Sequence, residues 1–176
     1  DDFKLSGSIA AHASGLAYLY YDKGGTIRLD STVVADGKFT IAGKVEGPVF
    51  ARLVFRPSST DTTRPWILSF YLEPGMVSVS SADTLKNVVV SGSKSDRDFL
   101  PIRKALMTFT AKLGVLNHEA RQYQAAQDTA GIKTVRSKMD ELEKGFKNDT
   151  YRKFLEQNPA SPVSLYALDQ VAGSYL

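Results

Sequence analysis

The sequence predicts an α+β protein, in which an N-terminal antiparallel β-sandwich of about eight strands precedes a helical hairpin and a third helix. Up to about residue 90, apolar and polar residues alternate with the period of a β-strand. From Phe99 onward, apolar residues recur every three or four positions, as on one face of an amphipathic helix. The two patterns meet in residues 71–99, so we expect a β domain at 1–93 and an α-helical region at 94–176.

The first half consists of short β-prone segments separated by turn-forming residues. Asp22-Lys23-Gly24-Gly25 and Asp36-Gly37 are typical hairpin connections, because glycine tolerates positive φ. Continuous alternation favours antiparallel pairing with one face in water, and no helix-length segment interrupts the strands. The expected strands lie at 3–9, 16–21, 26–35, 38–45, 49–55, 66–72, 76–80 and 88–90, with breaks at His12–Gly15 and Asp30-Ser31 and a polar loop at Pro57–Pro65.

The second half predicts helices at about 96–127, 132–157 and 161–174. Pro101 fits a first helical turn, where its missing N–H costs nothing, and Ser95 or Asp96 could cap that turn. Asn158-Pro159 ends the second helix. The inward stripes comprise Phe99, Ile102, Leu106, Phe109, Leu113, Leu116, Ala120 and Tyr123, then Ile132, Val135, Met139, Leu142, Phe146, Tyr151, Phe154 and Leu155, then Val163, Tyr166, Ala167, Val171 and Tyr175. These stripes suit burial on each other, burial on the sheet, or a dimer interface, and the sequence leaves the three alternatives open.

Composition restricts the chemistry of this chain. Its hydrophobic share of 43% and charged share of 23% are typical of a soluble globular protein. The net charge is +3, but lysines and arginines are scattered rather than clustered, so we do not expect nucleic acid as a partner. There is no cysteine, which excludes a disulfide, a thiolate metal site and a cysteine nucleophile within this chain. No apolar run is long enough to predict a membrane-spanning helix.

No constellation in the sequence meets the requirements of an active site, so we predict no catalytic residue, no cofactor and no metal ligand. His118-Glu119 has no second histidine one turn later, and the other histidine is His12. Gly24-Gly25 lacks the flanking residues of a phosphate-binding loop. A carboxylate cluster interleaved with lysines is typical of a solvated helix face, and it comprises Asp140, Glu141 and Glu143.

Aromatic residues are frequent in the expected strands. They usually belong to a core or to cross-strand pairs, although alternation directs some outward, where they could line a ligand platform. The residues concerned are Tyr18, Tyr20, Tyr21, Phe50, Phe55, Trp66, Phe70 and Tyr71.

Aspartate is repeatedly followed by serine or threonine, a pair that turns and helix caps favour. The pairs are Asp30-Ser31, Asp61-Thr62, Asp83-Thr84, Asp128-Thr129 and Asp149-Thr150. The first four also resemble an O-glycosylation acceptor motif of envelope proteins in Bacteroidetes-type bacteria.

Six motifs follow one another along the chain. They are Phe3-x-Leu-x-Gly7, Tyr18-Leu-Tyr, Asp30-Ser-x-Val-x-x-Asp-Gly37-Lys-Phe39, Phe70-Tyr-Leu-Glu-Pro-Gly75, Val90-Ser-Gly92-Ser and Asn158-Pro-x-Ser-Pro-Val-Ser-Leu-Tyr-Ala-Leu168. In this order they resemble the N-terminal domain of unknown function that precedes the thioredoxin-like domain in TlpA/ResA-like thiol-disulfide oxidoreductases of Bacteroidetes-type bacteria. The resemblance implies a signal or lipoprotein peptide upstream and a CxxC-containing thioredoxin domain downstream, and it assigns no catalytic residue to this sequence. The chain ends at Leu176 within an expected helix, as an interrupted polypeptide would.

The resemblance implies a non-catalytic accessory domain of a cell-envelope thiol-disulfide oxidoreductase, periplasmic or lipid-anchored through an N-terminal segment outside this sequence. Its expected partners are the downstream thioredoxin-like domain, envelope protein substrates and, through the helices, a second copy. Two alternatives remain open. A free-standing envelope ligand-binding module would be favoured by an exposed aromatic groove containing Trp66. A helical dimerisation stalk would be favoured by a dimer that Leu106→Asp or Leu113→Asp abolishes.

Overall fold

The structure is a computed structural model, and it describes residues 1–10, 14–58, 65–82 and 87–173. The chain divides into two compact units, Asp1–Phe99 and Leu100–Leu176. The first unit contains all the strands and the start of the first helix, and the second unit is helical. Of the break predicted at His12–Gly15, His12 and Ala13 lie outside the described residues, whereas Ser14 and Gly15 belong to a strand. Most of the loop predicted at Pro57–Pro65 also lies outside the described residues.

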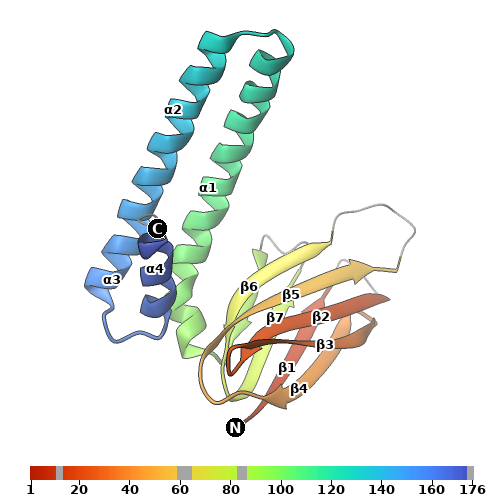
Figure 1. Ribbon diagram of the computed structural model, residues 1–176. Helices are drawn as coiled ribbons and strands as arrows, with labels where there is room; N and C mark the ends of the chain where they lie inside the picture. Colours follow the sequence, from red (N-terminus) through yellow and green to blue (C-terminus); the bar gives the residue numbers. More distant parts are fainter. Residues whose placement is uncertain (11–13, 59–64, 83–86, 174–176) are drawn as a thin grey trace. The chain divides into compact units, whose positions relative to one another are not determined.

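One eight-stranded sheet forms the first unit (Figure 1). Its strands follow one another across the sheet in the order β6-β5-β2-β3-β4-β1-β7-β8. In chain order they are β1 (Asp2–Ile9), β2 (Ser14–Lys23), β3 (Thr26–Ala35), β4 (Lys38–Lys44), β5 (Val49–Pro57), β6 (Trp66–Leu72), β7 (Gly75–Ser81) and β8 (Val89–Ser91). β3 is continuous through Asp30-Ser31, where the sequence had indicated a break.

Both predicted hairpins are confirmed, and each turn consists of two residues with positive φ. Lys23 pairs with Thr26 across Gly24 (φ 64°) and Gly25 (φ 82°). Ala35 pairs with Lys38 across Asp36 (φ 50°) and Gly37 (φ 69°). Two positive φ angles are what a tight hairpin turn requires, because that backbone matches the twist of the strands on either side.

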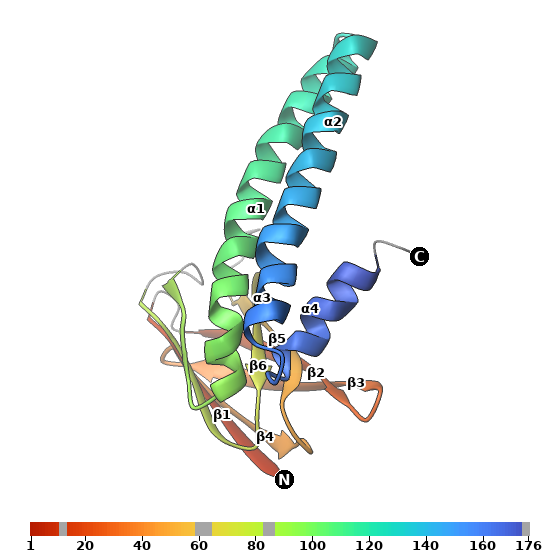
Figure 2. The same ribbon diagram turned by 90° about the vertical axis from the view of Figure 1, so that its left-hand side faces the viewer.

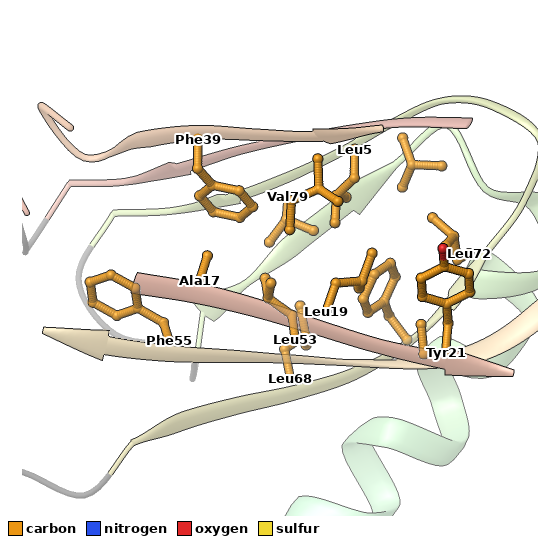
Figure 3. Close-up of a cluster of buried hydrophobic side chains, with 14 of the residues drawn as sticks. Leu5, Ala17, Leu19, Tyr21, Phe39, Leu53, Phe55, Leu68, Leu72 and Val79 are labelled. Carbon is orange, nitrogen blue, oxygen red and sulfur yellow. The ribbon is translucent and has the colours of Figure 1, made fainter. Parts of the chain in front are cut away.

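The predicted purely antiparallel sandwich is wrong, because the strands form a single mixed sheet. β1 pairs antiparallel with β4 but parallel with β7, where Phe3 lies opposite Gly75. The sheet curls into a nearly closed, barrel-like shape whose two halves face each other across the core (Figure 3). The alternation of apolar and polar residues predicts which face of a strand is buried, but it does not predict which strands pair. A curled sheet and a sandwich therefore give the same sequence pattern.

The core fills the space inside the curled sheet. Leu5 of β1 and Phe39 of β4 point inward from one half, towards Leu19 of β2 and Leu53 of β5 from the other (Figure 3). Leu5, Leu19 and Leu53 are completely buried. These side chains occupy every second position of their strands, which is the alternation that predicted the strands.

Helix α1 (Lys94–Ala125) begins on the outer side of the sheet. The Ser93 hydroxyl accepts a hydrogen bond from the Asp96 N–H (2.9 Å), and the buried Asp96 carboxylate accepts one from the Tyr71 N–H (3.1 Å). Phe99 packs edge-on against Tyr71 and Phe50, with ring centroids 5.5 Å and 5.8 Å away. The first residues of the helix are therefore part of the β unit.

Pro101 does not lie in the first helical turn, as predicted, but inside α1. The helix starts earlier because Ser93, rather than Ser95 or Asp96, accepts the hydrogen bond from its first turn. Pro101 follows shortly after the boundary between the two units at Phe99 and Leu100. A proline inside a helix removes one backbone hydrogen bond.

In the second unit, α1 and α2 (Thr129–Phe146) run side by side as a hairpin (Figures 1 and 2). Asp128 caps α2 by accepting a hydrogen bond from the Gly131 N–H (2.9 Å). The second helix continues through a π-helical turn, η2 (Lys147–Arg152), and α3 (Lys153–Gln157), and α4 (Val163–Ala172) follows. Among the helices of the described residues, none combines the length and the hydropathy needed to cross a membrane.

The π-helical turn places Tyr151 in the small core of the helical unit. Tyr151 is buried, and its ring lies edge-on to Phe146 (5.2 Å) and Tyr166 (6.0 Å). Val163 and Ala167 of α4 are also buried. The stripe predicted on α1 is confirmed as its less exposed side, but from Leu106 to Tyr123 it is only half-buried.

Candidate functional site

The outer surface of the curled sheet differs between its two halves. On β1, β4 and β7 it is mainly polar, apart from Ala42 and Met76, and it comprises Lys4, Ser6, Ser8, Lys38, Thr40, Lys44, Ser78 and Ser80. On β2, β3, β5 and β6 it is mainly apolar. We call this second surface the apolar face. It comprises Leu16, Tyr18, Tyr20, Ile27, Leu29, Val33, Arg52, Val54, Arg56 and Ile67, and the polar residues Asp22, Ser31 and Ser69 lie in the same outward rows.

Strand register makes the apolar face continuous. Leu16 lies beside Val33, and Tyr20 lies beside Leu29, because β2 and β3 are joined by the two-glycine turn. Tyr18 lies beside Val54 of β5, which pairs in turn with Ile67 of β6. Neighbours in such pairs are close enough for their side chains to touch. The face therefore extends across four strands.

These side chains are exposed to an unusual degree for their size. Six of its aliphatic and aromatic residues have exposed fractions between 37% and 68%. They are Leu16, Tyr20, Ile27, Leu29, Val33 and Ile67. Single exposed apolar residues are ordinary, but a continuous apolar surface of this kind usually marks a site of interaction.

Two arginines supply the charge of the apolar face. The Arg56 guanidinium lies over the Tyr18 ring, 5.6 Å from its centroid. Arg52, on the same side of β5, is exposed and forms no ion pair with another described residue. Arginine and tyrosine are the residue types that protein interfaces favour. The face offers a partner apolar contact and guanidinium donors.

One end of the apolar face is already occupied within the β unit. Phe50 and Tyr71 belong to the same outward rows of β5 and β6, and Phe99 covers them. Tyr71 is consequently buried, although it projects outward from the sheet. The start of α1 shows how an apolar segment packs on this surface.

The aromatic residues singled out in the sequence divide between the two sides of the sheet. Tyr18, Tyr20, Phe50 and Tyr71 project outward, whereas the others belong to the core or pack against it. The inward group comprises Tyr21, Phe55, Trp66 and Phe70. The Trp66 ring lies 5.7 Å from that of Phe55, and Trp66 packs against the core.

Tyr21 projects into the core and holds its phenolic proton firmly. It is buried and donates a hydrogen bond to the Asp30 carboxylate (2.7 Å). Burial, the hydrogen bond to Asp30 and the charge of Asp30 together raise the pKa of Tyr21 to about 12. The tyrosine is therefore neutral at physiological pH and acts as a hydrogen-bond donor.

The other candidates from the sequence remain apart from one another. His118 is exposed and lies 3.1 Å from the Gln122 amide, and Glu119 forms an ion pair with Lys138 (3.4 Å). The carboxylate cluster is exposed on α2, where Glu143 pairs with Lys147 (2.7 Å). Within the described residues, no three histidine or carboxylate side chains gather as a metal ion would require. His12 lies outside the described residues.

Two Asp-Ser/Thr pairs have structural roles. Asp30 accepts the hydrogen bond of Tyr21, and Asp128 caps helix α2. Asp149 pairs with Lys153 (2.9 Å) one turn later. Asp61-Thr62 and Asp83-Thr84 lie outside the described residues.

The sequence analysis missed the aliphatic members of the apolar face, although the β2–β3 hairpin contained a signal for them. A two-residue turn at Gly24-Gly25 fixes Leu29 beside Tyr20. The inward positions of β3 then fall on Arg28, Asp30, Thr32 and the buried Val34, whereas Ile27, Leu29 and Val33 fall outside. Apolar residues on the solvent-exposed face of a hairpin predict an interaction surface.

The first unit is thus a mixed-sheet β domain that ends in the first turns of a helix. Residues 3–99 match the family model described as a domain of unknown function, DUF4369, and the chain belongs to this family. The match ends at Phe99, where the compact β unit also ends. No curated protein matches the chain, and no solved structure matches it.

Proposed function

We propose that this chain is a non-catalytic accessory domain of a cell-envelope thiol-disulfide oxidoreductase, and that its apolar face binds a protein surface. The protein bound is either the thioredoxin-like domain of the same polypeptide, which the face positions, or an envelope protein on which that domain acts. The order of the six sequence motifs supports the parent class. The chain has no cysteine, so the thiol chemistry belongs to another domain.

The contrast between the two halves of the sheet carries the proposal. The same curled sheet has a mainly polar outer surface on β1, β4 and β7 and an apolar one on β2, β3, β5 and β6. Folding requires only the inner surface to be apolar. Exposing an outer surface of this composition to water is unfavourable in free energy, and a partner that covers it removes this cost.

The parent class is tested by reading the coding sequence beyond Leu176. A CxxC motif in a strand-then-helix context supports the proposal. A reading frame with no such motif contradicts the oxidoreductase part of the proposal, but not the docking part.

The docking part is tested in the complete polypeptide with Leu29→Asp, which places a charge in the apolar face. Thr40→Asp, on the polar half of the same sheet, is the matched control. We expect Leu29→Asp to slow thiol-disulfide exchange with protein substrates while Thr40→Asp leaves it unchanged. If exchange with a small dithiol slows as well, the face positions the redox domain; if only exchange with proteins slows, the face recognises substrates. Equal rates for both variants and the unmodified protein would refute docking.

The ligand-binding alternative lacks the observation that would favour it. That alternative depended on an exposed aromatic groove containing Trp66, whereas Trp66 packs against the core. The apolar face extends over four strands and suits a protein surface better than a small molecule, which normally binds in a concave pocket.

A further inference from the structure

The helical unit has its own uncovered surface, along one side of the α1–α2 hairpin. Two helices alone bury only one stripe of each other, and from Leu106 to Tyr123 the stripe of α1 is half-buried. α4 packs against η2 and α3, at the base of the hairpin. Helical hairpins of this type commonly complete their core by pairing into four-helix bundles.

A groove runs between the two helices on this side. It has a volume of about 440 Å³, and its floor includes Phe109 and Phe146, whose rings stack with centroids 4.4 Å apart. Leu142 of α2 extends the apolar floor. The full lining comprises Ala105, Thr108, Phe109 and Lys112 from α1 and Glu141, Leu142, Gly145, Phe146, Asp149 and Thr150 from the second helix.

Gly145 makes the groove deeper than the fold of one chain requires. A Cβ atom added at Gly145 would meet no atom within 4 Å, so no neighbour in the same chain demands a glycine there. Glycine in the interior of a helix is destabilising relative to alanine. A glycine that the chain itself does not need leaves room for another helix to approach closely.

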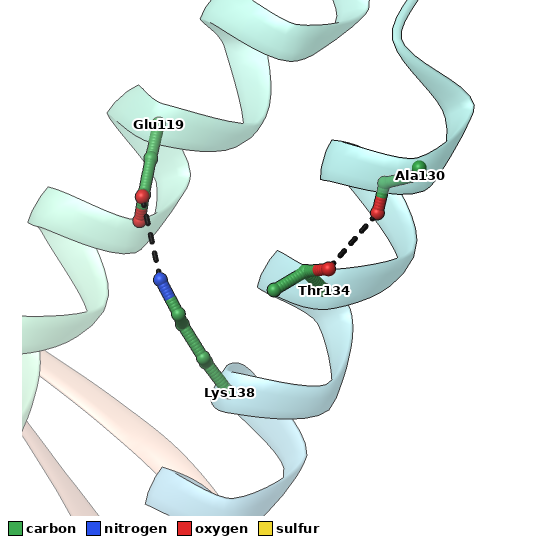
Figure 4. A network of polar contacts seen from close by, with 4 residues as sticks. All are labelled: Glu119, Ala130, Thr134 and Lys138. Atoms are coloured by element: carbon green, nitrogen blue, oxygen red, sulfur yellow. Dashed lines mark hydrogen bonds and ion pairs between the residues drawn. The ribbon is translucent and has the colours of Figure 1, made fainter.

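The two rims of the groove have opposite charge. Lys112 stands on the α1 rim, and Glu141 stands on the α2 rim. Neither forms an ion pair with another described residue. Nearer the tip of the hairpin, Glu119 and Lys138 do form an ion pair between the two helices (3.4 Å), as Figure 4 shows. Lys112 and Glu141 therefore remain available to a partner.

We propose that this groove binds the same groove of a second copy of the chain, forming a symmetric dimer through the helices. In a two-fold interface every contact from one residue to a second residue of the other copy is matched by the reciprocal contact, so the surface must be complementary to itself. A groove with a positive rim and a negative rim meets this condition, since Lys112 of each copy faces Glu141 of the other. The seam around Phe109 and Phe146 then forms the centre of a four-helix bundle.

The steric test compares two glycines. Gly145→Gln fills the groove, whereas Gly114→Gln adds the same side chain to α1 outside the groove lining, where an added Cβ also meets nothing within 4 Å. Sedimentation equilibrium of the 176-residue chain measures dimerisation, and circular dichroism checks that each variant is helical. We expect a dimer for the unmodified chain and for Gly114→Gln, and at least a tenfold weaker dimer for Gly145→Gln, about the effect of losing one well-packed contact. A monomeric unmodified chain at about 100 μM, or equal dimerisation of both variants, would overturn the proposal.

The electrostatic test uses charge reversal at the rims. Lys112→Glu and Glu141→Lys should each weaken self-association, because each places like charges opposite one another twice in the dimer. Mixing the two variants should restore a heterodimer, since every rim contact is again between opposite charges. If the mixture dimerises no better than the separate variants, the two rims do not face each other and the proposed symmetry is wrong.

Discussion

The Glu73 carboxylate joins β6 to the beginning of α1 by binding Ser95. One Glu73 oxygen accepts hydrogen bonds from the Ser95 hydroxyl (2.6 Å) and the Ser95 N–H (3.1 Å), and the other accepts one from the Lys94 N–H (2.7 Å). The first N–H groups of a helix have no partner within the helix, so an acceptor beside them is stabilising. Glu73 belongs to the Leu-Glu-Pro-Gly motif and Ser95 follows the Ser-Gly-Ser motif, so two motifs of the sequence meet at this joint.

Replacing Glu73 by alanine should destabilise the β unit. The substitution leaves the Lys94 and Ser95 N–H groups without their acceptor, and losses of helix caps cost about 1 kcal/mol. Urea denaturation of Glu73→Ala measures the effect, with Glu46→Ala as the control because Glu46 is exposed. A Glu73→Ala midpoint equal to that of Glu46→Ala would show that the joint adds nothing to stability.

The same joint should make stability depend on pH in the acid range. Partial burial acts to raise the pKa of Glu73, but hydrogen bonds from Ser95, Lys94 and Ser93 outweigh it and hold the pKa below its usual value. The folded state therefore binds the proton less readily than the unfolded state. This contribution is complete above the usual pKa of glutamate and is lost as the pH falls through the lowered pKa. Unfolding free energies of the unmodified chain and Glu73→Gln should thus differ at neutral pH and converge in acid; a constant difference would contradict the assigned pKa shift.

Much of the secondary structure could be predicted because its signals are local. Alternation indicated the strands, and Gly24-Gly25 and Asp36-Gly37 indicated two hairpins that the register confirms. The helical stripes indicated the hairpin for a similar reason, since spacings of three and four residues are a property of one helix. The π-helical turn also has a local signal in the sequence. Phe146 and Tyr151 of the apolar stripe lie five positions apart, which is the spacing of hydrogen bonds in a π-helix.

The parts that could not be predicted depend on contacts between distant residues. The parallel pairing of Phe3 with Gly75 makes the sheet mixed, and no local pattern specifies it. The bond between Glu73 and Ser95 is likewise invisible in either segment alone. The apolar face lies between these cases: its β2–β3 part follows from the hairpin register, whereas its continuation onto β6 requires the order of the strands.

Two leucines on neighbouring strands should respond very differently to truncation. Leu19 of β2 is completely buried in the core, whereas Leu29 of β3 is 50% exposed on the apolar face. Leu19→Ala should lower the free energy of unfolding by about 2–5 kcal/mol, because it removes buried methyl groups and leaves a cavity. Leu29→Ala should change it by less than about 0.5 kcal/mol. Equilibrium denaturation of both variants checks the pair, and a large loss for Leu29→Ala would mean that this leucine serves folding rather than binding.

The Tyr21–Asp30 hydrogen bond should be visible in the alkaline range. The pKa of Tyr21 is raised to about 12 by burial first and by Asp30 second, while the charge of Arg28 acts to lower it. The folded protein therefore holds the tyrosine proton more tightly than the unfolded chain does. The resulting stability is complete below about pH 10, the usual tyrosine pKa, and is lost as the pH rises to about 12. Tyrosinate absorbance during a pH titration, compared with that of Tyr21→Phe, isolates this group. Asp30→Asn should lower the Tyr21 pKa without restoring its usual value, because burial remains, and Arg28→Gln should raise it. Shifts in the same direction for both variants would be incompatible with Asp30 and Arg28 acting on Tyr21 through their opposite charges.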